Sequence, residues 1–343
     1  MQRFESSAFQ AHISCPRTDV QLVRHGAVLT VSLSYRGAYG MGEKYDALNQ
    51  KGRVVVNQVE EKFCFQGEKT YCPTPFFWTD SGFGLYVDTC ETTTFHFDEN
   101  SVTIDLPESA PVVAFSGEPA QIVSAYMELF GKAVLPPEWA FGVWVSANRW
   151  NCQKDAEQQI ENLKKHDFPA SILVLEAWSD EATFYIWNGA KYQPNPNGAA
   201  LQYDDFDFSG SPWPDPKGMV DALHKAGLHL VLWQIPVYKK QGANEILNVQ
   251  NTLDREDAVR RGLCVHLADG TPYTIPDGHW FSGSMIPDYT NPETVQTWFS
   301  KRQYLLDMGV DGFKTDGGEF IYRPDVRFMD GSDGKSGKNR YAR

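Results

Sequence analysis

Two different hydrophobic patterns divide the chain. Up to about residue 132, short runs rich in β-branched and aromatic residues alternate with Gly, Pro, Asn and Asp, which is typical of antiparallel strands. A helical period follows at Pro119–Phe130 and ends at Gly131. We therefore predict an antiparallel β-sandwich closed by a helical link near 119–131. The predicted strands are Val20–Val23, Ala27–Ser34, Arg53–Val56, Gly82–Asp88, Thr92–Phe97 and Val102–Leu106.

From Leu135 onward, apolar strands alternate with amphipathic helices. Near-continuous apolar strands separated by helices indicate a parallel sheet that is buried on both faces. Long insertions at 179–216 and 237–291 follow the second and third strands, on the side where α/β barrels carry their sites. The predicted strands are Trp139–Val145, Ala170–Trp178, Leu228–Ile235 and Val310–Thr315, and the predicted helices are Lys154–Lys165, Lys217–Ala226 and Pro292–Met308.

The strand–helix alternation fits either a barrel or a doubly wound open sheet. No G-x-G-x-x-G motif follows the first strand, which disfavours a dinucleotide-binding sheet. A (β/α)8 barrel needs eight strands, and a half barrel leaves two unpaired edges. We expect an N-terminal β-sandwich domain over 1–132, then the first half of a (β/α)8 TIM barrel over 133–343. The remainder of the barrel is expected from a missing C-terminal part.

Charge and composition exclude several classes of protein. A formal net charge of −13, with Lys and Arg scattered, argues against a nucleic-acid partner. No apolar run approaches the roughly 20 residues that a membrane span needs. The first residues lack the pattern of a signal peptide, so a cytoplasmic location is expected. The cysteines show no C-x-x-C pair and are expected to be free thiols rather than metal ligands: Cys15, Cys64, Cys72, Cys90, Cys152 and Cys264.

The strongest local signal for chemistry is the stretch GVDGFKTDGGEF at 309–320. Strand alternation puts Lys314 and Asp316 on one face, at the carboxyl end of the fourth strand. An ammonium group close to a carboxylate lowers the pKa of the carboxyl, which suits a nucleophile. A strand-end Asp that caps a turn and pairs with Lys fits the same spacing equally well.

Other strands end in polar or aromatic residues at the same predicted rim. Glu176 and Trp178 share a face after the second strand, and Trp233 ends the third. Arg149 or Trp150 follows the first strand. Core packing, or pairing of Glu176 with a Lys, explains each of these residues singly, but their convergence favours a pocket for a polar small molecule.

Six ordered stretches resemble glycoside hydrolase family 31. They are GMGEKYDALNQKG (40–52), PTPFFWTDSGFGLYVD (73–88), LPPEWAFGVW (135–144), WPDPKGMVDALHKAGLHLVLWQIP (213–236), DYTNPETVQTWF (288–299) and GVDGFKTDGGEF. The sequence FKTD followed by GE, together with FMDGSDGKSGKNRYA (328–342), is most similar to the α-xylosidase branch. This family includes α-glucosidases, α-xylosidases and α-galactosidases.

The resemblance implies specific roles. Asp316 matches the catalytic nucleophile, and Lys314 matches a lysine that contacts sugar hydroxyls. Glu176 stands where the family has an Asp that binds the terminal sugar, which puts the identity of the sugar in doubt. Trp178 and Trp233 match aromatic residues of that subsite. The acid/base Asp, a sugar-binding Arg and a His are expected beyond residue 343, and neither Asp180 nor Glu319 matches the acid.

We therefore expect a retaining exo-acting α-glycosidase that hydrolyses a terminal α-xyloside, α-glucoside or α-galactoside by double displacement. No cofactor or metal is expected, and the partner is an oligosaccharide or glycoside substrate. A homo-oligomer is left open. Because it lacks the acid/base residue, the isolated chain is expected to be inactive or very weak. The alternatives are a carbohydrate-binding fragment without turnover and an α-transglycosylase.

Overall fold

Two units of different architecture make up the chain. The computed structural model describes residues 2–6, 9–13, 19–61 and 65–341. The first unit comprises Met1–Val134, Glu319–Asp325 and Ser332–Arg343, and the second Leu135–Gly318 and Val326–Gly331. Two late segments thus join the first unit, although the sequence-based limits of 1–132 and 133–343 place them with the barrel. Asn339 shows one reason, because its side-chain amide accepts the Val59 N–H at 2.7 Å and donates to the Asn57 carbonyl at 3.2 Å.

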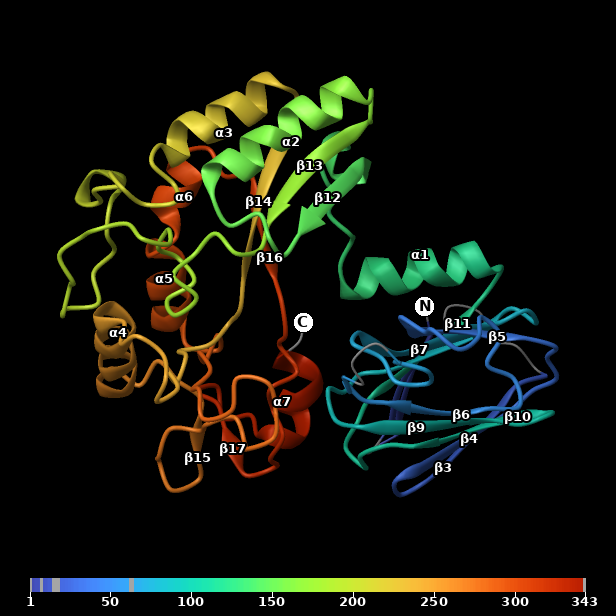
Figure 1. Cartoon of the computed structure of the whole chain (residues 1–343). Coiled ribbons are helices and arrows are strands. Elements are labelled where there is room, and N and C mark those ends of the chain that lie inside the picture. The colour runs from blue at the N-terminus through green and yellow to red at the C-terminus, as the bar shows by residue number, and fades with distance from the viewer. Residues whose placement is uncertain (1, 7–8, 14–18, 62–64, 342–343) are drawn as a thin grey trace. The chain divides into compact units, whose positions relative to one another are not determined.

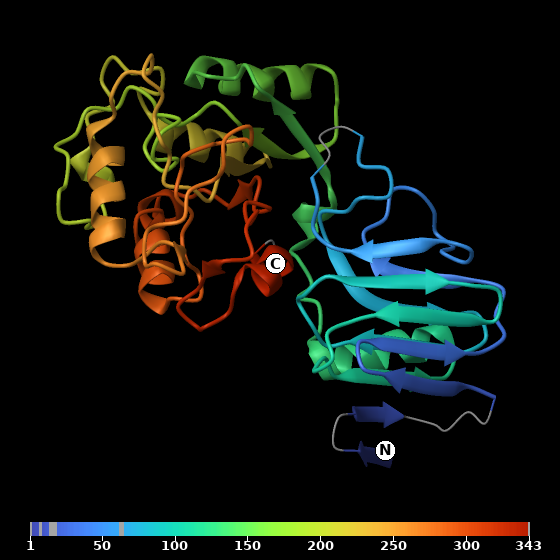
Figure 2. The same ribbon diagram turned by 90° about the horizontal axis from the view of Figure 1, so that it is seen from below.

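The first unit is a sandwich of two sheets (Figures 1 and 2). Strands are antiparallel in both sheets except for the parallel pair β2–β11. The six-stranded sheet has the order β1 (Gln2–Ser6), β2 (Phe9–Ile13), β11 (Val112–Ser116), β8 (Phe83–Val87), β7 (Pro73–Thr79), β5 (Ala38–Gly42). The five-stranded sheet has the order β3 (Gln21–His25), β4 (Val28–Ser32), β10 (Ser101–Asp105), β9 (Thr93–Phe97), β6 (Val54–Asn57).

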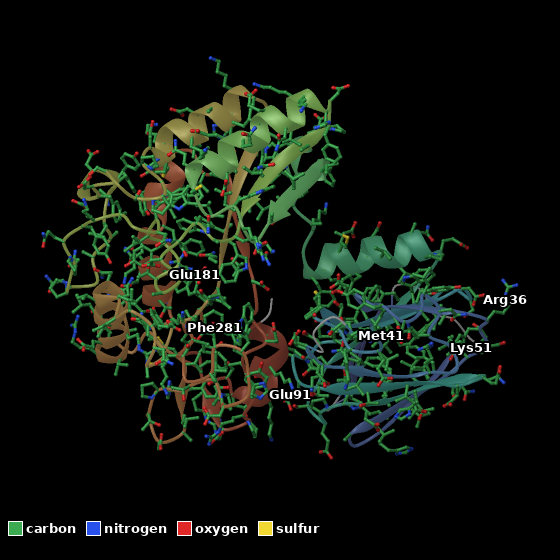
Figure 3. The ribbon with its side chains drawn as sticks, viewed as in Figure 1. Arg36, Met41, Lys51, Glu91, Glu181 and Phe281 are labelled. Carbon is green, nitrogen blue, oxygen red and sulfur yellow. The ribbon has the colours of Figure 1, made fainter. Side chains whose placement is uncertain are left out.

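Helix α1 (Pro119–Phe130) covers the outer face of the six-stranded sheet (Figure 1). Strand β8 is therefore buried along its whole length, whereas β9 and β10 alternate between buried and partly exposed residues. This difference follows from whether one or both faces of a strand are packed. Met41, labelled inside the sandwich in Figure 3, is 1% exposed and adopts φ 68°. Helix α7 (Gly334–Tyr341) also belongs to this unit.

The second unit is built on four parallel strands, half the number in a closed TIM barrel. The sheet order is β12 (Val143–Ala147), β13 (Ala170–Leu175), β14 (His229–Gln234), β16 (Gly312–Thr315), and α2 (Gln153–Lys165) and α3 (Pro216–Lys225) cover one face (Figure 1). Leu173, Leu175, Leu230 and Leu232 are buried against those helices. The edge strands β12 and β16 are more exposed than the central pair.

The remaining elements lie mostly in the insertions and the last predicted helix, with a 3-10 turn before β12 and a short strand after β16. None of the helices in the described residues is long and apolar enough to cross a bilayer. The helix predicted at Pro292–Met308 is interrupted at Lys301 and Arg302, whose side chains enter a buried polar cluster. The elements are α5 (Pro292–Ser300), α6 (Gln303–Asp307), α4 (Val249–Arg260), the strand pair β15 (His266–Leu267) and β17 (Val326–Arg327), and two 3-10 turns at Glu138–Phe141 and Tyr203–Asp205.

Candidate active site

Asp316 lies immediately after β16, at the carboxyl end of the parallel sheet. Its Oδ2 accepts the indole N–H of Trp233 at 3.0 Å, and its Oδ1 accepts the Gly317 N–H at 2.9 Å. Its own N–H donates to the Gln234 carbonyl at 2.9 Å, which continues the β14–β16 ladder. The carboxylate is partly buried and is oriented by two N–H donors. Such donors fix the direction of the oxygens.

Lys314 pairs with Glu176, which corrects the expected pairing with Asp316. The Lys314 ammonium lies 2.7 Å from Glu176 Oε1, and the hydroxyl of Ser146 donates to the same oxygen at 3.0 Å. No ion pair of Asp316 is found within the described part of the chain. The lysine side chain is 45% exposed and the glutamate 19%, so this pair faces solvent at the sheet end. Glu176 follows the last residue of β13, and its contacts with Lys314 and Ser146 place it at the strand ends, as the sequence predicts.

Trp178 does not share that face. It is 0% exposed and packs with Trp187 and Trp213 in the core on the helix-covered side of the sheet. Strand β13 ends at Leu175, so the alternation that would align positions 176 and 178 stops before both of them. The Trp178 indole N–H donates to the Trp233 carbonyl at 2.7 Å. Trp178 thus fixes the backbone of the residue that orients Asp316, and its expected contact with sugar stays a prediction.

An aromatic cluster that the sequence analysis missed surrounds Trp233. Phe184 meets Trp233 edge-on at 5.5 Å between ring centroids and meets Phe281 at 5.8 Å. Trp280 lies 6.4 Å from Trp233 and is 49% exposed. These rings belong to the long insertions after β13 and β14. Aromatic residues within those insertions were the sequence feature that could have predicted the cluster. An exposed indole such as that of Trp280 can stack on the apolar face of a sugar.

Three residues of these insertions hold left-handed backbone conformations: Glu181 at φ 52°, Phe184 at 58° and Phe281 at 57°. Glu181 and Phe281 are labelled in Figure 3. Positive φ costs energy in a non-glycine residue and concentrates at functional sites. Asp180 anchors the first turn by accepting the N–H groups of Ala182 and Thr183 and the Asn248 amide. Burial raises the pKa of the Asp180 carboxyl, and these donors oppose the rise. Its donors mark Asp180 as a loop anchor, which agrees with leaving it unassigned as the acid.

The residues expected after the first strand are at the end of β12. Arg149 is exposed, and Trp150 is partly buried against the core under α2. The structure brings neither into contact with Asp316 or Glu176, and their binding roles stay predictions. Cys72, Cys90, Cys152 and Cys264 are free thiols, whereas Cys15 and Cys64 lie outside the described residues.

One group of described residues has the composition of a metal site. Asp311 accepts hydrogen bonds on its two oxygens from His224 at 2.8 Å and His229 at 2.7 Å, and the Leu230 N–H binds it at 2.8 Å. The cluster lies at the amino ends of β14 and β16, opposite Asp316. Burial tends to raise the pKa of the Asp311 carboxyl, but these hydrogen bonds outweigh it and lower that pKa below its ordinary value. The site at Asp316 contains no comparable set of ligands among the described side chains.

Comparison with known proteins decides the family. The model of the glycosyl hydrolase family 31 TIM-barrel domain matches residues 133–341, and the model of that family's N-terminal galactose mutarotase-like domain matches residues 26–96. The chain belongs to glycoside hydrolase family 31. Both the family and the predicted arrangement, a sheet domain followed by a TIM-barrel domain, are thereby confirmed.

The names of similar proteins refer to several oligosaccharides. The chain is 37% identical to an isomaltosyltransferase of Sporosarcina globispora, with 88% of this chain and 28% of that protein covered. It is also 37% identical to a 1,3-alpha-isomaltosidase of Kribbella flavida, with coverages of 88% and 43%. A cycloalternan-forming enzyme of Listeria monocytogenes, solved with a pentasaccharide substrate, has a TM-score of 0.86 at 37% identity, with coverages of 94% and 31%.

The chain therefore spans less than half the length of these relatives. An α-xylosidase of Lactiplantibacillus pentosus is 26% identical over 88% of the chain. The predicted similarity to α-xylosidases is confirmed, but the sequence identity to this α-xylosidase is lower than that to the isomaltosyltransferase and the 1,3-alpha-isomaltosidase.

Proposed function

We propose that the protein is a retaining α-glycosidase for α-glucosyl units of isomaltose-containing oligosaccharides, with Asp316 as its nucleophile. The observation that carries the proposal is the Asp316 carboxylate, held by Trp233 and Gly317 at the carboxyl end of β16. Membership of the glycosidase family and the names of the 37% identical relatives support the reaction class and the sugar.

In the proposed mechanism, an Asp316 oxygen attacks the anomeric carbon while the bond from that carbon to the leaving oxygen breaks. The glycosyl-enzyme ester is then opened by water, so the anomeric configuration is retained. Retaining enzymes of this kind need a second carboxyl group about 5–5.5 Å from the nucleophile, to protonate the leaving oxygen. The family resemblance assigns that acid to no residue of this chain. The two N–H donors, one to each oxygen of Asp316, fix the orientation of the carboxylate, which reduces the cost of reaching the transition state.

Sugar recognition follows from the neighbouring groups. Glu176 and Lys314 present an acceptor and a donor at the same open edge, and sugar hydroxyls can replace part of their mutual contact. Trp280, with half its surface exposed, offers a flat apolar face near Trp233. We propose that these three side chains bind the terminal glucosyl unit. The cytoplasmic location also stays a proposal.

The decisive experiment uses a leaving group that needs no acid. A 5-fluoro-α-glucosyl fluoride should transfer its sugar to Asp316, and peptide mass spectrometry should locate the added mass on the peptide that contains it. Asp316→Asn should abolish labelling, while Asp307→Asn, an exposed carboxylate on α6, should leave it unchanged. Labelling of another carboxylate, or none on folded protein that binds isomaltose, would refute the assignment.

Transfer to a second sugar is the alternative outcome. One relative is named a transferase and another an isomaltosidase at the same 37% identity, so the comparison favours neither water nor sugar as acceptor. Product analysis with excess isomaltose distinguishes them. Glucose alone indicates hydrolysis, whereas longer oligosaccharides indicate transfer.

A further inference from the structure

Two neighbouring residues of β14, Trp233 and Gln234, contact Asp316. Trp233 donates its indole N–H to the Asp316 carboxylate at 3.0 Å, whereas the carbonyl of Gln234 accepts the Asp316 N–H at 2.9 Å. Because side chains alternate along a strand, the side chain of Gln234 points to the opposite face of the sheet from that of Trp233. Gln234 is 5% exposed, and its Nε2 donates to Thr315 Oγ1 at 2.8 Å. Gln234 thus contacts both Thr315 and Asp316 at the end of β16.

An arginine at the junction of α5 and α6 holds the side chain of Gln234. Arg302 Nε donates to Gln234 Oε1 at 2.5 Å, and Nη1 donates to the Trp298 carbonyl at 3.0 Å. The guanidinium carbon lies 3.6 Å from the centre of the Trp298 ring, and Arg302 is 1% exposed. A guanidinium only donates hydrogen bonds, so it keeps the amide oxygen of Gln234 toward itself and the amide nitrogen toward Thr315. Arg302 therefore determines the orientation of the Gln234 side chain.

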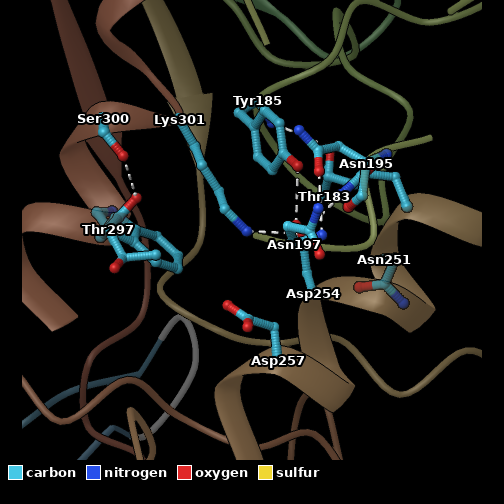
Figure 4. A network of polar contacts seen from close by, with 12 residues as sticks. Thr183, Tyr185, Asn195, Asn197, Asn251, Asp254, Asp257, Thr297, Ser300 and Lys301 are labelled. Atoms are coloured by element: carbon cyan, nitrogen blue, oxygen red, sulfur yellow. Dashed lines mark hydrogen bonds and ion pairs between the residues drawn. The ribbon is translucent and has the colours of Figure 1, made fainter. Parts of the chain in front are cut away.

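Arg302 is itself part of a buried cluster of charged and aromatic side chains. Its guanidinium carbon lies 5.7 Å from the centre of the Tyr185 ring. Asp254, on α4, accepts Lys301 Nζ at 2.6 Å and the Tyr185 hydroxyl at 2.8 Å (Figure 4). Asp180 supplies a second carboxyl group near Tyr185, so the cluster contains two cations and two carboxyl groups. Because separating buried charges is costly, this arrangement holds Arg302 in place.

We propose that Arg302 is a positioning residue for the nucleophile and acts through Gln234 on the backbone of Thr315 and Asp316. This inference rests on the proposed function, which assigns Asp316 as the nucleophile. The Trp233 indole orients the carboxylate, and Arg302 sets the position of the backbone from which that carboxylate projects. A misplacement of about 1 Å can lower a reaction rate on the order of 100-fold, so a residue without contact to the substrate can affect the rate.

Labelling of Asp316 by a 5-fluoro-α-glucosyl fluoride tests the proposal, because its rate reports the nucleophilic step alone. Arg302→Lys keeps the charge of the cluster but loses the planar fork that holds Gln234. The maximal labelling rate should fall about 10-fold, while the reagent concentration at half-maximal rate should change less than about 2-fold, because the contacts to the sugar are unaltered. Arg255→Lys is the matched control and should label at the unaltered rate, since Arg255 is a partly buried arginine that donates to the Tyr238 carbonyl.

Nuclear magnetic resonance gives a readout that does not depend on catalysis. The indole N–H of Trp233 donates to the Asp316 carboxylate, so its resonance reports the position of that carboxylate. In protein with isotope-labelled tryptophan, this resonance is identified by its loss in Trp233→Phe. It should move in Arg302→Lys and stay in place in Arg255→Lys.

A milder variant tests the same path without altering the buried cluster. Thr315→Val removes the oxygen that accepts the Gln234 amide, at an exposed position of β16, and should slow labelling about 3-fold. Thr315→Val and Arg302→Lys both release the side chain of Gln234. Their effects on the labelling rate should therefore not add in the double variant.

The outcomes separate this inference from the proposed function. If the unaltered protein is not labelled, Asp316 is not the nucleophile, and the indole resonance still decides whether Arg302 sets the position of its carboxylate. Labelling of Arg302→Lys at the unaltered rate with an unmoved resonance would overturn the inference, as would unaltered labelling of Thr315→Val. Equal losses in Arg302→Lys and Arg255→Lys would also overturn it, because general packing would then explain the change.

Discussion

The second unit contains two clusters of charged and aromatic side chains that differ mainly in burial. At the strand ends, Lys314 and Glu176 form an ion pair that is 45% and 19% exposed. Between α4 and α5, Lys301 and Asp254 form the same kind of pair at 5–6% side-chain exposure. Exposed pairs contribute little to stability and can exchange partners with a ligand. Buried pairs are costly to break because the remaining charge is left in the interior without a counter-charge. The first cluster is suited to binding and the second to holding the fold.

Breaking the buried pair should give the largest change in stability. Asp254→Asn leaves Lys301 without its counter-charge, and we expect a loss of about 3–5 kcal/mol of unfolding free energy, measured by urea denaturation. Asp221→Asn, an exposed position on α3, should change that free energy by less than about 0.5 kcal/mol. A loss below about 1 kcal/mol at position 254 would mean that the contrast between the clusters is wrong.

At the exposed pair, the effect should be on binding instead. Lys314→Met removes a charged donor from the proposed sugar site, so KM for an α-glucosyl fluoride, whose leaving group needs no acid, should rise roughly 10–100-fold with little change in unfolding free energy. Lys225→Met, at the end of α3, serves as the control. A stability loss comparable to that of Asp254→Asn would contradict the distinction.

The indole that orients Asp316 allows a finer test within the exposed cluster. Trp233→Phe keeps a smaller aromatic ring but removes the N–H donated to the carboxylate, and kcat for an α-glucosyl fluoride should fall about 5–10-fold, the cost of one hydrogen bond. Trp144→Phe removes an indole N–H that donates to the Ala140 carbonyl, and kcat should not change. Equal effects of the two substitutions would show that general packing, rather than orientation of Asp316, is responsible.

The smallest effect is expected at Asp311, at the opposite end of the strands. Its pKa is lower in the folded protein than in the unfolded chain, so its contribution to stability is fully present above the unfolded pKa of about 3.9 and is lost as pH falls through the folded value. Asp311→Asn should destabilise by about 1 kcal/mol at pH 6, and by progressively less as pH falls below about 4. A difference that does not depend on pH in urea denaturation would contradict this ionic role.

Regular hydrophobic periods allowed most of the fold to be predicted. The helix at Pro119–Phe130 and the order of the four parallel strands match the structure, because each has a regular apolar pattern in the sequence. Helix α4 was missed because its inner face is polar, so it has no apolar period. Strand β7 was missed because prolines interrupt it. The buried polar residues of α4 are Gln250, Asn251, Asp254 and Asp257.

The sequence predicted where the residues of the candidate site lie along the strands, but it did not predict which side chains they contact. Alternation correctly placed Glu176 and Lys314 at the strand ends, whereas their pairing joins residues 138 positions apart and depends on strand order. Trp178 was misplaced because its strand ends three residues earlier. Trp280 lies in an irregular insertion, where periodicity carries no information about exposure. Local sequence patterns therefore predict which face a side chain occupies, whereas the tertiary structure decides which other side chains it contacts.

The contact from Trp178 through Trp233 to Asp316 has a spectroscopic consequence. Trp233 is partly exposed and donates its indole N–H to a carboxylate, whereas Trp178 is 0% exposed and donates to a backbone carbonyl, so the two indoles should differ in emission wavelength and intensity. If a sugar binds beside Asp316 as proposed, the surroundings of Trp233 should change while those of Trp178 stay constant. The contribution of Trp233 to the fluorescence of the ten tryptophans should then report that binding.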